Sequence, residues 1–213
     1  MSDRARLPLP ETAIDAACDA LAAQGWAALE DAFPPPLLHR LRAEADALAS
    51  TGRLRPAGIG RGRGHQARHD LRGDATCWLD DPACGAPARD FLAGMDALLT
   101  ALNRRLLLGL ASLEAHYALY PPGARYTRHL DRFRDDDSRT LSLVLYLNPD
   151  WRPGDGGELR LFLPEGERDL PPRFGHAVLF LSDRIEHEVL VTRIPRYSIA
   201  GWFRRRPLDP LRA

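Results

Sequence analysis

Residues 126–148 read YTRHLDRFRDDDSRTLSLVLYLN, and this stretch decides the fold class. Its second half alternates regularly, with leucine at 141, 143, 145 and 147. In a β-strand, alternate residues point to opposite faces, so these leucines share one face and Ser142, Val144 and Tyr146 share the other. We expect the leucine face to pack against helices and the mixed face to line a pocket.

The same pattern of short strands continues on both sides of this stretch. Further strands are predicted at 113–120, 125–131, 158–163, 177–182, 186–192 and 197–204. Proline and glycine separate them, as in PPG at 121–123 and PGDGG at 153–157. Short strands at this spacing are typical of a β-sandwich or barrel.

The first half of the chain has helical periodicity instead. Helices are predicted at 11–24, 35–50 and about 87–108, with a short strand at 26–30. Between them, 52–74 is rich in Arg, Gly and His, with glycine at every second position from 58 to 64, which predicts a mobile loop. We therefore expect one α+β domain over 1–213, with mainly helical support at 1–110 and a barrel core at 111–206.

Composition excludes several classes of function. The chain has 213 residues, 29 basic and 29 acidic, and every basic residue is Arg. Without Lys there is no Schiff base and no P-loop lysine. A net charge of +0 argues against general binding of nucleic acid or membrane surfaces.

Cysteine usage and hydropathy bear on location. No apolar run approaches the ~18 residues of a membrane span, and the polar start MSDRAR does not resemble a signal peptide. Cys18, Cys77 and Cys84 are odd in number and lack C-x-x-C spacing, so we expect ordinary thiols and a cytoplasmic protein. The sequence gives no indication of oligomeric state.

Candidate metal ligands begin in the quoted stretch. His129 and Asp131 stand two apart on a predicted strand, so they present a nitrogen and a carboxylate to one face. His187 lies at the start of a later predicted strand and supplies a second imidazole. Two His and one carboxylate form the facial triad of non-haem Fe(II) oxygenases, which leaves coordination positions open. An H-x-D pair alone is more typical of a surface or capping pair.

Arg196 adds a second kind of site. On a strand it shares a face with the small residues Ser198 and Ala200 and with Trp202. A guanidinium in a confined pocket needs an anion, and its planar fork matches a carboxylate. Tyr146, on the mixed face, can reach the same carboxylate. The alternative is an Arg paired with an acid at a rim.

With these residues in view, the sequence resembles the 2-oxoglutarate- and Fe(II)-dependent prolyl hydroxylases, in the branch of the animal hypoxia-inducible-factor prolyl hydroxylases and their bacterial relatives. The matching motifs run in family order over roughly residues 58–205: RGD at 72–74 with Trp78, YP at 120–121 with Gly123, YTRHLD at 126–131, LYLNPDW at 145–151, GGELRLF at 156–162, FLSDR at 180–184, HEV at 187–189, and RY at 196–197 through Trp202.

The resemblance implies a double-stranded β-helix, or jelly roll, with supporting helices. It implies that His129, Asp131 and His187 bind Fe(II), that Arg196 and Tyr146 bind 2-oxoglutarate, and that Tyr120 lies beside it. The segment from Tyr120 to His129 is one residue shorter than in the animal enzymes. The residues implied to surround the substrate are Arg72, Asp74, Trp78, Arg139 and Trp202, with the glycine-rich loop closing over it.

The activity implied is hydroxylation of a prolyl residue in a protein, with O2 as cosubstrate, succinate and CO2 as products, and ascorbate as a candidate reductant. Because Asp131 supplies a carboxylate, hydroxylation is expected rather than halogenation. A translation factor such as elongation factor Tu is the candidate substrate. Two alternatives remain open: the same chemistry on a small molecule or free amino acid, and a non-catalytic cupin-like binding module.

Five further histidines are expected to be solvent-facing or internally satisfied rather than ligands. They are His39, His65, His69, His116 and His176.

Overall fold

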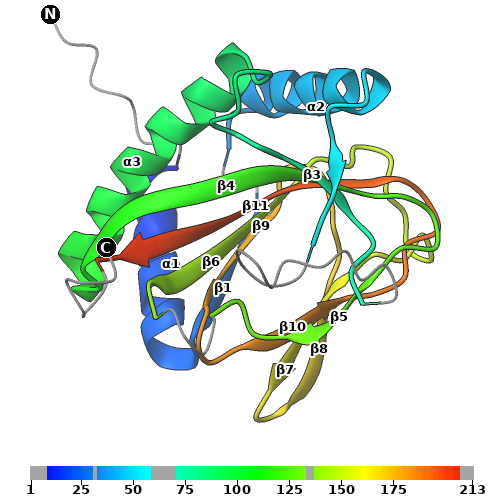
Figure 1. Cartoon of the computed structure of the whole chain (residues 1–213). Helices are drawn as coiled ribbons and strands as arrows, with labels where there is room; N and C mark the ends of the chain where they lie inside the picture. The colour runs from blue at the N-terminus through cyan, green and yellow to red at the C-terminus, as the bar shows by residue number, and fades with distance from the viewer. Residues whose placement is uncertain (1–8, 31–32, 59–70, 133–136, 207–213) are drawn as a thin grey trace, which may run out of the picture.

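The computed structural model of the chain describes residues 9–30, 33–58, 71–132 and 137–206. Figure 1 shows two antiparallel sheets that face each other, with helices packed on the outer side of the larger one. This is the architecture of a double-stranded β-helix, which confirms the predicted fold class.

The helices are α1 (Glu11–Gln24), α2 (Pro35–Ser50) and α3 (Ala86–Leu106). Helix α1 ends at Gly25, whose φ of 82° suits the left-handed cap, and α2 begins with prolines that need no N–H partner in the first turn. The first two match their predicted bounds. Helix α3 stops at Leu106, short of 108, because Leu107 adopts a left-handed φ of 54° and caps the helix.

The larger sheet has seven strands and the smaller has four. In spatial order the larger sheet consists of β1 (Trp26–Leu29), β9 (Ala177–Leu181), β6 (Arg139–Tyr146), β11 (Arg196–Arg205), β4 (Leu110–Tyr120), β3 (Ala75–Trp78) and β2 (Arg55–Pro56). The smaller sheet consists of β5 (Tyr126–His129), β10 (Glu186–Val189), β7 (Leu159–Leu163) and β8 (Gly166–Leu170).

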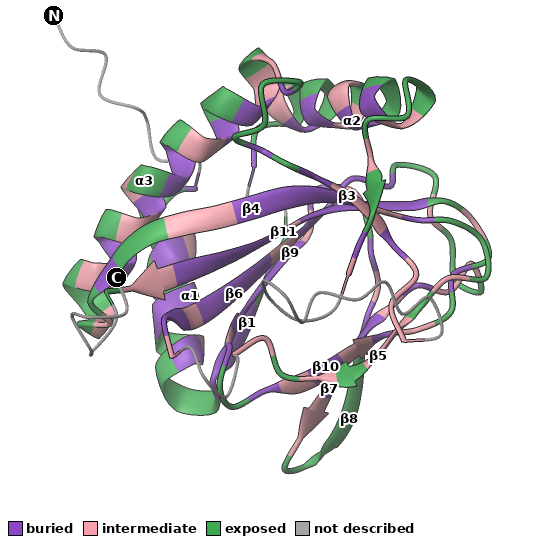
Figure 2. Cartoon of the chain, viewed as in Figure 1, coloured by how far each residue is buried: buried purple, intermediate pink, exposed green. Residues whose placement is uncertain are grey.

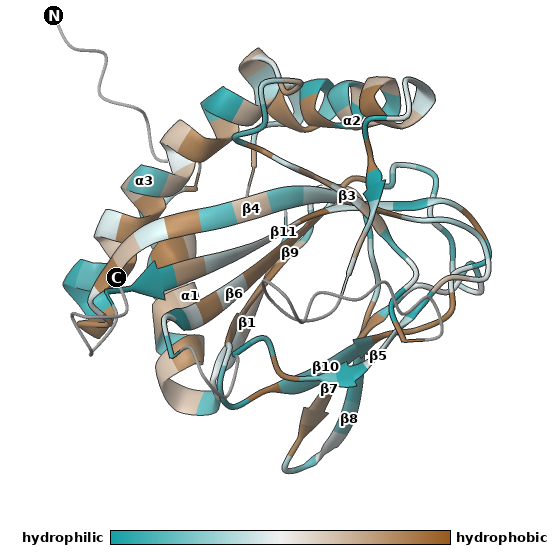
Figure 3. Cartoon of the chain, viewed as in Figure 1, coloured by the Kyte–Doolittle hydropathy of each residue, from teal (hydrophilic) through white to brown (hydrophobic). Residues whose placement is uncertain are grey.

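The two faces of β6 behave as predicted. Leu141, Leu143 and Leu145 belong to the core shared with the helices, whereas Val144 and Tyr146 belong to a second apolar cluster between the sheets. Figure 2 shows the middle of the large sheet buried and β8 exposed. Figure 3 shows the same contrast in hydropathy, with hydrophilic residues along β5 and β8. The buried polar side chains of Ser142, Arg196 and Ser198 share the inward face of the large sheet with this apolar cluster.

Some elements differ from the sequence-based prediction. Strand β5 ends at His129 rather than at 131, and β2, β3 and β8 were not predicted. These strands are short: β2 and β3 are stabilised by pairing with segments farther along the chain, whereas β8 forms a hairpin with the preceding β7. In the predicted mobile loop 52–74, the ends are paired, through β2 and through a bridge between Arg72 and Tyr126, while 59–70 lies outside the described residues.

Among the described residues, none of the helices combines the length and apolar character that crossing a membrane requires.

Candidate active site and metal centre

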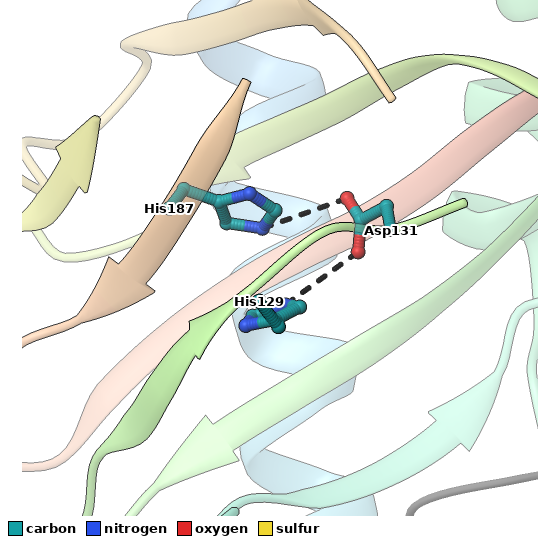
Figure 4. A group of neighbouring side chains, drawn as sticks. All are labelled: His129, Asp131 and His187. Atoms are coloured by element: carbon teal, nitrogen blue, oxygen red, sulfur yellow. Dashed lines mark ion pairs between the residues drawn. The ribbon is translucent and has the colours of Figure 1, made fainter. Parts of the chain in front are cut away.

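Three potential metal ligands meet at the edge of the smaller sheet. Strands β5 and β10 pair antiparallel with His129 opposite His187, and Asp131 follows β5 by two residues. Each histidine Nε2 lies 3.6 Å from one oxygen of Asp131 (Figure 4). One ligand atom from each residue lies within 4.8 Å of the others. The predicted ligand set is thus brought together by strand register.

Backbone carbonyls fix the orientation of both imidazoles. His129 Nδ1 lies 2.7 Å from Thr127 O, and His187 Nδ1 lies 3.1 Å from Ile185 O. Because a carbonyl can only accept, each Nδ1 carries the hydrogen and each Nε2 keeps its lone pair. That lone pair is the one directed at Asp131, where a metal ion would be held.

Asp131 is held in its ionised form. Burial alone raises the pKa of its carboxyl, but His187, His129 and a 2.7 Å hydrogen bond from the Ser142 hydroxyl outweigh burial and hold the pKa well below its ordinary value. Ser142 in turn contacts Ser182 at 2.8 Å. For His187, burial lowers the pKa to about 4, so the imidazole is neutral at neutral pH. A carboxylate with two imidazoles is a donor set suited to a divalent cation.

A second polar site lies at the opposite end of the same cavity. Arg196 is fully buried; its Nε donates to Gly157 O at 2.7 Å and its Nη1 to Ser198 Oγ at 3.1 Å. Its Nη2 is buried without a hydrogen-bond partner, as is the hydroxyl of Tyr146. Among the described residues no carboxylate pairs with this guanidinium. An unpaired buried cation is costly, so this site is suited to binding an anion.

Two tyrosines flank that guanidinium. Its central carbon lies 5.1 Å from the ring centre of Tyr120 and 5.2 Å from that of Tyr146. Burial raises the pKa of Tyr146 to about 12, so its hydroxyl remains a hydrogen-bond donor. The ring of Tyr120 lies beside the Arg196 guanidinium, and its place beside bound 2-oxoglutarate stays a prediction.

The double glycine at 156–157 creates room for Arg196. Gly157 has a φ of 75°, and a Cβ there would lie 2.8 Å from Arg196 Cδ. A side chain at this position would be strained and would collide with the arginine. The glycine therefore serves a close approach rather than flexibility.

An open groove of about 490 Å³ adjoins the metal ligands. Its walls include Trp78 from β3 and Trp202 from β11, and its inner end reaches His129 and Asp131. Trp78 is 43% exposed and Trp202 is buried, so one ring forms the rim and the other lies deeper. Both were predicted to surround a substrate, and both face this groove.

The other predicted substrate residues are engaged in ion pairs. Arg72 binds the buried Asp74 in a bidentate pair, at 2.6 and 2.9 Å. Arg139 donates to Glu114 at 2.8 Å and lies 3.6 Å above the ring of Trp202. Of these residues, Arg72, Arg139 and Glu114 line the groove, whereas Asp74 lines the inner cavity.

One groove residue was missed by sequence reasoning. His116 was grouped with the spare histidines, yet it lines both the groove and the inner cavity and is 3% exposed. The alternation along β4 could have revealed it, because His116 shares a face with Ala118 and Tyr120.

Comparison with known proteins agrees with this geometry. Residues 115–204 match the family described as the 2OG-Fe(II) oxygenase superfamily. The crystal structure of a Pseudomonas putida prolyl-4-hydroxylase is 46% identical, with a TM-score of 0.82 over 91% of this chain and 99% of that one. The chain belongs to the prolyl hydroxylase family of 2-oxoglutarate- and Fe(II)-dependent oxygenases. Enzymes of this family use Fe(II), 2-oxoglutarate and O2.

Two further prolyl hydroxylases extend the comparison. A prolyl hydroxylase from Trichoplax adhaerens, in complex with a hypoxia inducible factor oxygen degradation domain peptide fragment, is 25% identical with a TM-score of 0.80, over 91% of this chain and 90% of that one. Egl nine homolog 1 of Homo sapiens is 29% identical over 209 residues, which are 92% of this chain. The chain spans 48% of that relative's length.

The site is suited to both groups that prolyl hydroxylases require. The two imidazoles and the carboxylate of Asp131 are ligands that Fe(II) accepts, and three protein ligands leave positions open. The orphaned Nη2 of Arg196 and hydroxyl of Tyr146 are donors suited to the far carboxylate of 2-oxoglutarate.

Lowering the pH from 6.5 to about 4 should destabilise the metal-free protein. Burial lowers the pKa of His116, like that of His187, to about 4, with Arg72 and Arg139 adding to the effect and Asp74 opposing it. Between the ordinary value of 6.5 and about 4, the unfolded chain binds more protons, so stability falls as pH falls. The lowered pKa of each of these two histidines contributes about 3 kcal/mol to the free energy of unfolding at neutral pH, and acid removes this contribution.

Urea unfolding of the metal-free protein at a series of pH values measures this loss. His116→Gln should remove about half of this loss of unfolding free energy, because His187 still titrates in the variant. Asp131 does not contribute in this range, since its effect appears only below its ordinary pKa of 3.8. An unchanged pH dependence in His116→Gln would contradict the assignment.

Proposed function

We propose that this protein hydroxylates a prolyl residue in a protein substrate, coupled to conversion of 2-oxoglutarate and O2 to succinate and CO2. The observation that carries the proposal is the common cavity of the His129–Asp131–His187 cluster and the unpaired Arg196 guanidinium. A binding module would need neither the open ligand positions nor a buried cation beside them, which disfavours a non-catalytic function.

The chain's own residues have separate tasks in this reaction. Arg196 and Tyr146 would hold the far carboxylate of 2-oxoglutarate through the unpaired Nη2 and hydroxyl, in the cavity that Arg196 shares with the metal ligands. Tyr120 excludes water from that end of the cavity. Asp131 would hold the metal together with His129 and His187, and its carboxylate favours hydroxylation over halogenation. When bound, iron and 2-oxoglutarate supply the oxidising chemistry.

The shape of the groove favours a peptide segment over a free amino acid. It extends from Asp131 past Trp78 to the edge strand β2, and its volume of about 490 Å³ exceeds that of the inner cavity, about 50 Å³. The aromatic faces of Trp78 and Trp202 suit contact with a prolyl ring. The peptide complex of the Trichoplax relative supports the same interpretation.

A lysate experiment tests the proposed function. The purified protein is incubated with Fe(II), 2-oxoglutarate, ascorbate and a bacterial lysate, and peptides are searched for proline that has gained the mass of one oxygen atom. We expect few modified sites, each absent when 2-oxoglutarate is omitted.

Purified elongation factor Tu serves as a separate arm, because we propose a translation factor as the substrate. Succinate release that depends on a free amino acid, with no modified protein, would favour the small-molecule alternative. No substrate-dependent succinate release would contradict the enzyme assignment.

We also propose a cytoplasmic location, which the free thiols of Cys18, Cys77 and Cys84 support, since reducing compartments keep thiols in that form.

A further inference from the structure

His116 lies in the interior row of side chains that crosses the large sheet. Strand register places it opposite Trp78 of β3 on one side and Ala200 of β11 on the other. Opposite Ala200, the row continues to Val144 of β6. The next row towards the metal ligands contains Trp202 and Ser142, and Ser142 binds Asp131. His116 is therefore one residue row away from the serine that holds a metal ligand.

The hydrogen bonding of His116 leaves one nitrogen as an acceptor. Its Nδ1 lies 3.1 Å from Tyr117 O, and because a carbonyl only accepts, Nδ1 is the donor. The imidazole is neutral at neutral pH, since burial and two nearby arginines lower its pKa. Nε2 then keeps its lone pair, and no hydrogen bond joins it to any residue that the structure describes. Nε2 is not fully buried and opens onto the groove, where a ligand or water can supply the hydrogen.

The neighbouring indole supplies the complementary group. Trp202 Nε1 is buried without a hydrogen-bond partner, and the ring centres of Trp202 and His116 lie 5.4 Å apart. Trp78 packs edge-on against His116 at 5.1 Å. Between aromatic faces, the groove wall thus carries one unpaired donor and one unpaired acceptor, which is the complement of a peptide backbone.

We propose that His116 is a substrate-binding residue that recognises the peptide backbone. Its Nε2 accepts a hydrogen bond from the backbone N–H of a residue adjacent to the target proline. Trp202 Nε1 donates a hydrogen bond to a backbone carbonyl of the same segment. Proline has no N–H of its own, so the donor must come from a neighbouring residue. This inference rests on the proposed function, because it assigns the groove to a peptide. The same two contacts would favour a chain segment over free proline, which lacks both neighbours.

Backbone ester substitution tests the hydrogen bond directly. A panel of acetylated, amidated heptapeptides with a central proline is screened for hydroxylation by the complete enzyme with Fe(II) and 2-oxoglutarate. For the best peptide, two analogues are made in which an ester oxygen replaces the N–H of the residue before or after the proline. One ester should lower the kcat/KM of the wild-type enzyme about tenfold, the value expected for a lost hydrogen bond to an acceptor left unpaired.

Three variants locate the partner of that N–H. His116→Met should lower kcat/KM for the amide peptide about tenfold and make the amide and ester equally good within about twofold, because the acceptor is gone. His116→Gln retains an acceptor and should recover part of the preference for the amide. His39→Met, an exposed histidine on α2 outside the groove, should keep the full ester penalty.

The outcomes separate this inference from the proposed function. If the amide peptide is hydroxylated but the ester penalty persists in His116→Met, or neither ester is penalised in the wild type, the inference is wrong and the function stands. If lysate proteins are hydroxylated but none of the peptides is, recognition of a short segment fails and this inference fails with it. If neither is hydroxylated, the proposed function fails as well. Fluorescence of Trp78 and Trp202 on peptide binding checks that a poorly active His116 variant still folds and binds.

Discussion

We expect Asp131→Ala to lose hydroxylation by roughly a thousandfold or more, because the metal supplies several kcal/mol of transition-state stabilisation. The substitution removes the carboxylate that both Nε2 atoms face at 3.6 Å and leaves only two imidazoles for a cation. It also removes the acceptor of the Ser142 hydroxyl. Both Fe(II) affinity and substrate-dependent succinate release should fall, and each is measured separately.

Asp169→Ala is the matched control for this loss. Asp169 is a half-exposed carboxylate on β8, paired with Arg160 at 2.7 Å and remote from the cavity. An exposed pair of this kind contributes little, so the control should keep nearly full activity. Full hydroxylation by Asp131→Ala would refute the metal site.

The second large effect is expected from Arg196→Met, which should raise the KM for 2-oxoglutarate by about a hundredfold to a thousandfold. Truncating one partner of a buried, hydrogen-bonded charge pair costs about 2–5 kcal/mol. Methionine fills much of the space that the arginine stem occupies but leaves the far carboxylate without Nη2 or charge. Arg196→Lys keeps the positive charge but lacks the planar guanidinium. Its KM for 2-oxoglutarate should therefore lie between that of the wild type and that of Arg196→Met.

A cosubstrate analogue distinguishes lost recognition from general damage. The wild-type enzyme should strongly prefer 2-oxoglutarate to 2-oxovalerate, which lacks the far carboxylate, whereas Arg196→Met should lose most of that preference. Arg160→Met, on the exposed outer side of β7, should keep it. A preserved preference in Arg196→Met would show that another group binds the far carboxylate.

The local sequence pattern predicted correctly those helices and strands that bury one face against the core. The leucines of β6 and the apolar stripes of the helices have a period that leaves one side against the core, and this period is visible in the chain. Strands β2, β3 and β8 were missed, because β2 has two residues and β8 is almost wholly exposed. β2 and β3 depend on partners farther along the chain, whereas β8 pairs with the adjacent β7 but has no alternating buried face to reveal it.

The residues of the candidate site likewise fall into those that local sequence predicts and those that only strand pairing brings together. The H-x-D spacing and the place of Arg196 on its strand are local features, and they indicate the metal ligands and the anion site from the amino-acid pattern alone. His116 has no such motif, and its place in the groove follows from the register between β3, β4 and β11. The closeness of His187 to His129 likewise depends on the pairing of β10 with β5, although 58 positions separate them in the sequence.

By itself, the sequence determined which residue types were available and on which faces they lie. It contains no lysine, so any basic group for a carboxylate must be an arginine, and strand alternation turns Arg196 inward. Only the tertiary structure decided that this guanidinium has a buried, unpaired Nη2, that Arg72 and Arg139 are already paired, and that His116 offers an acceptor. The physical reason is that burial and hydrogen-bond partners arise from contacts between distant segments, whereas side-chain direction is set by the local backbone.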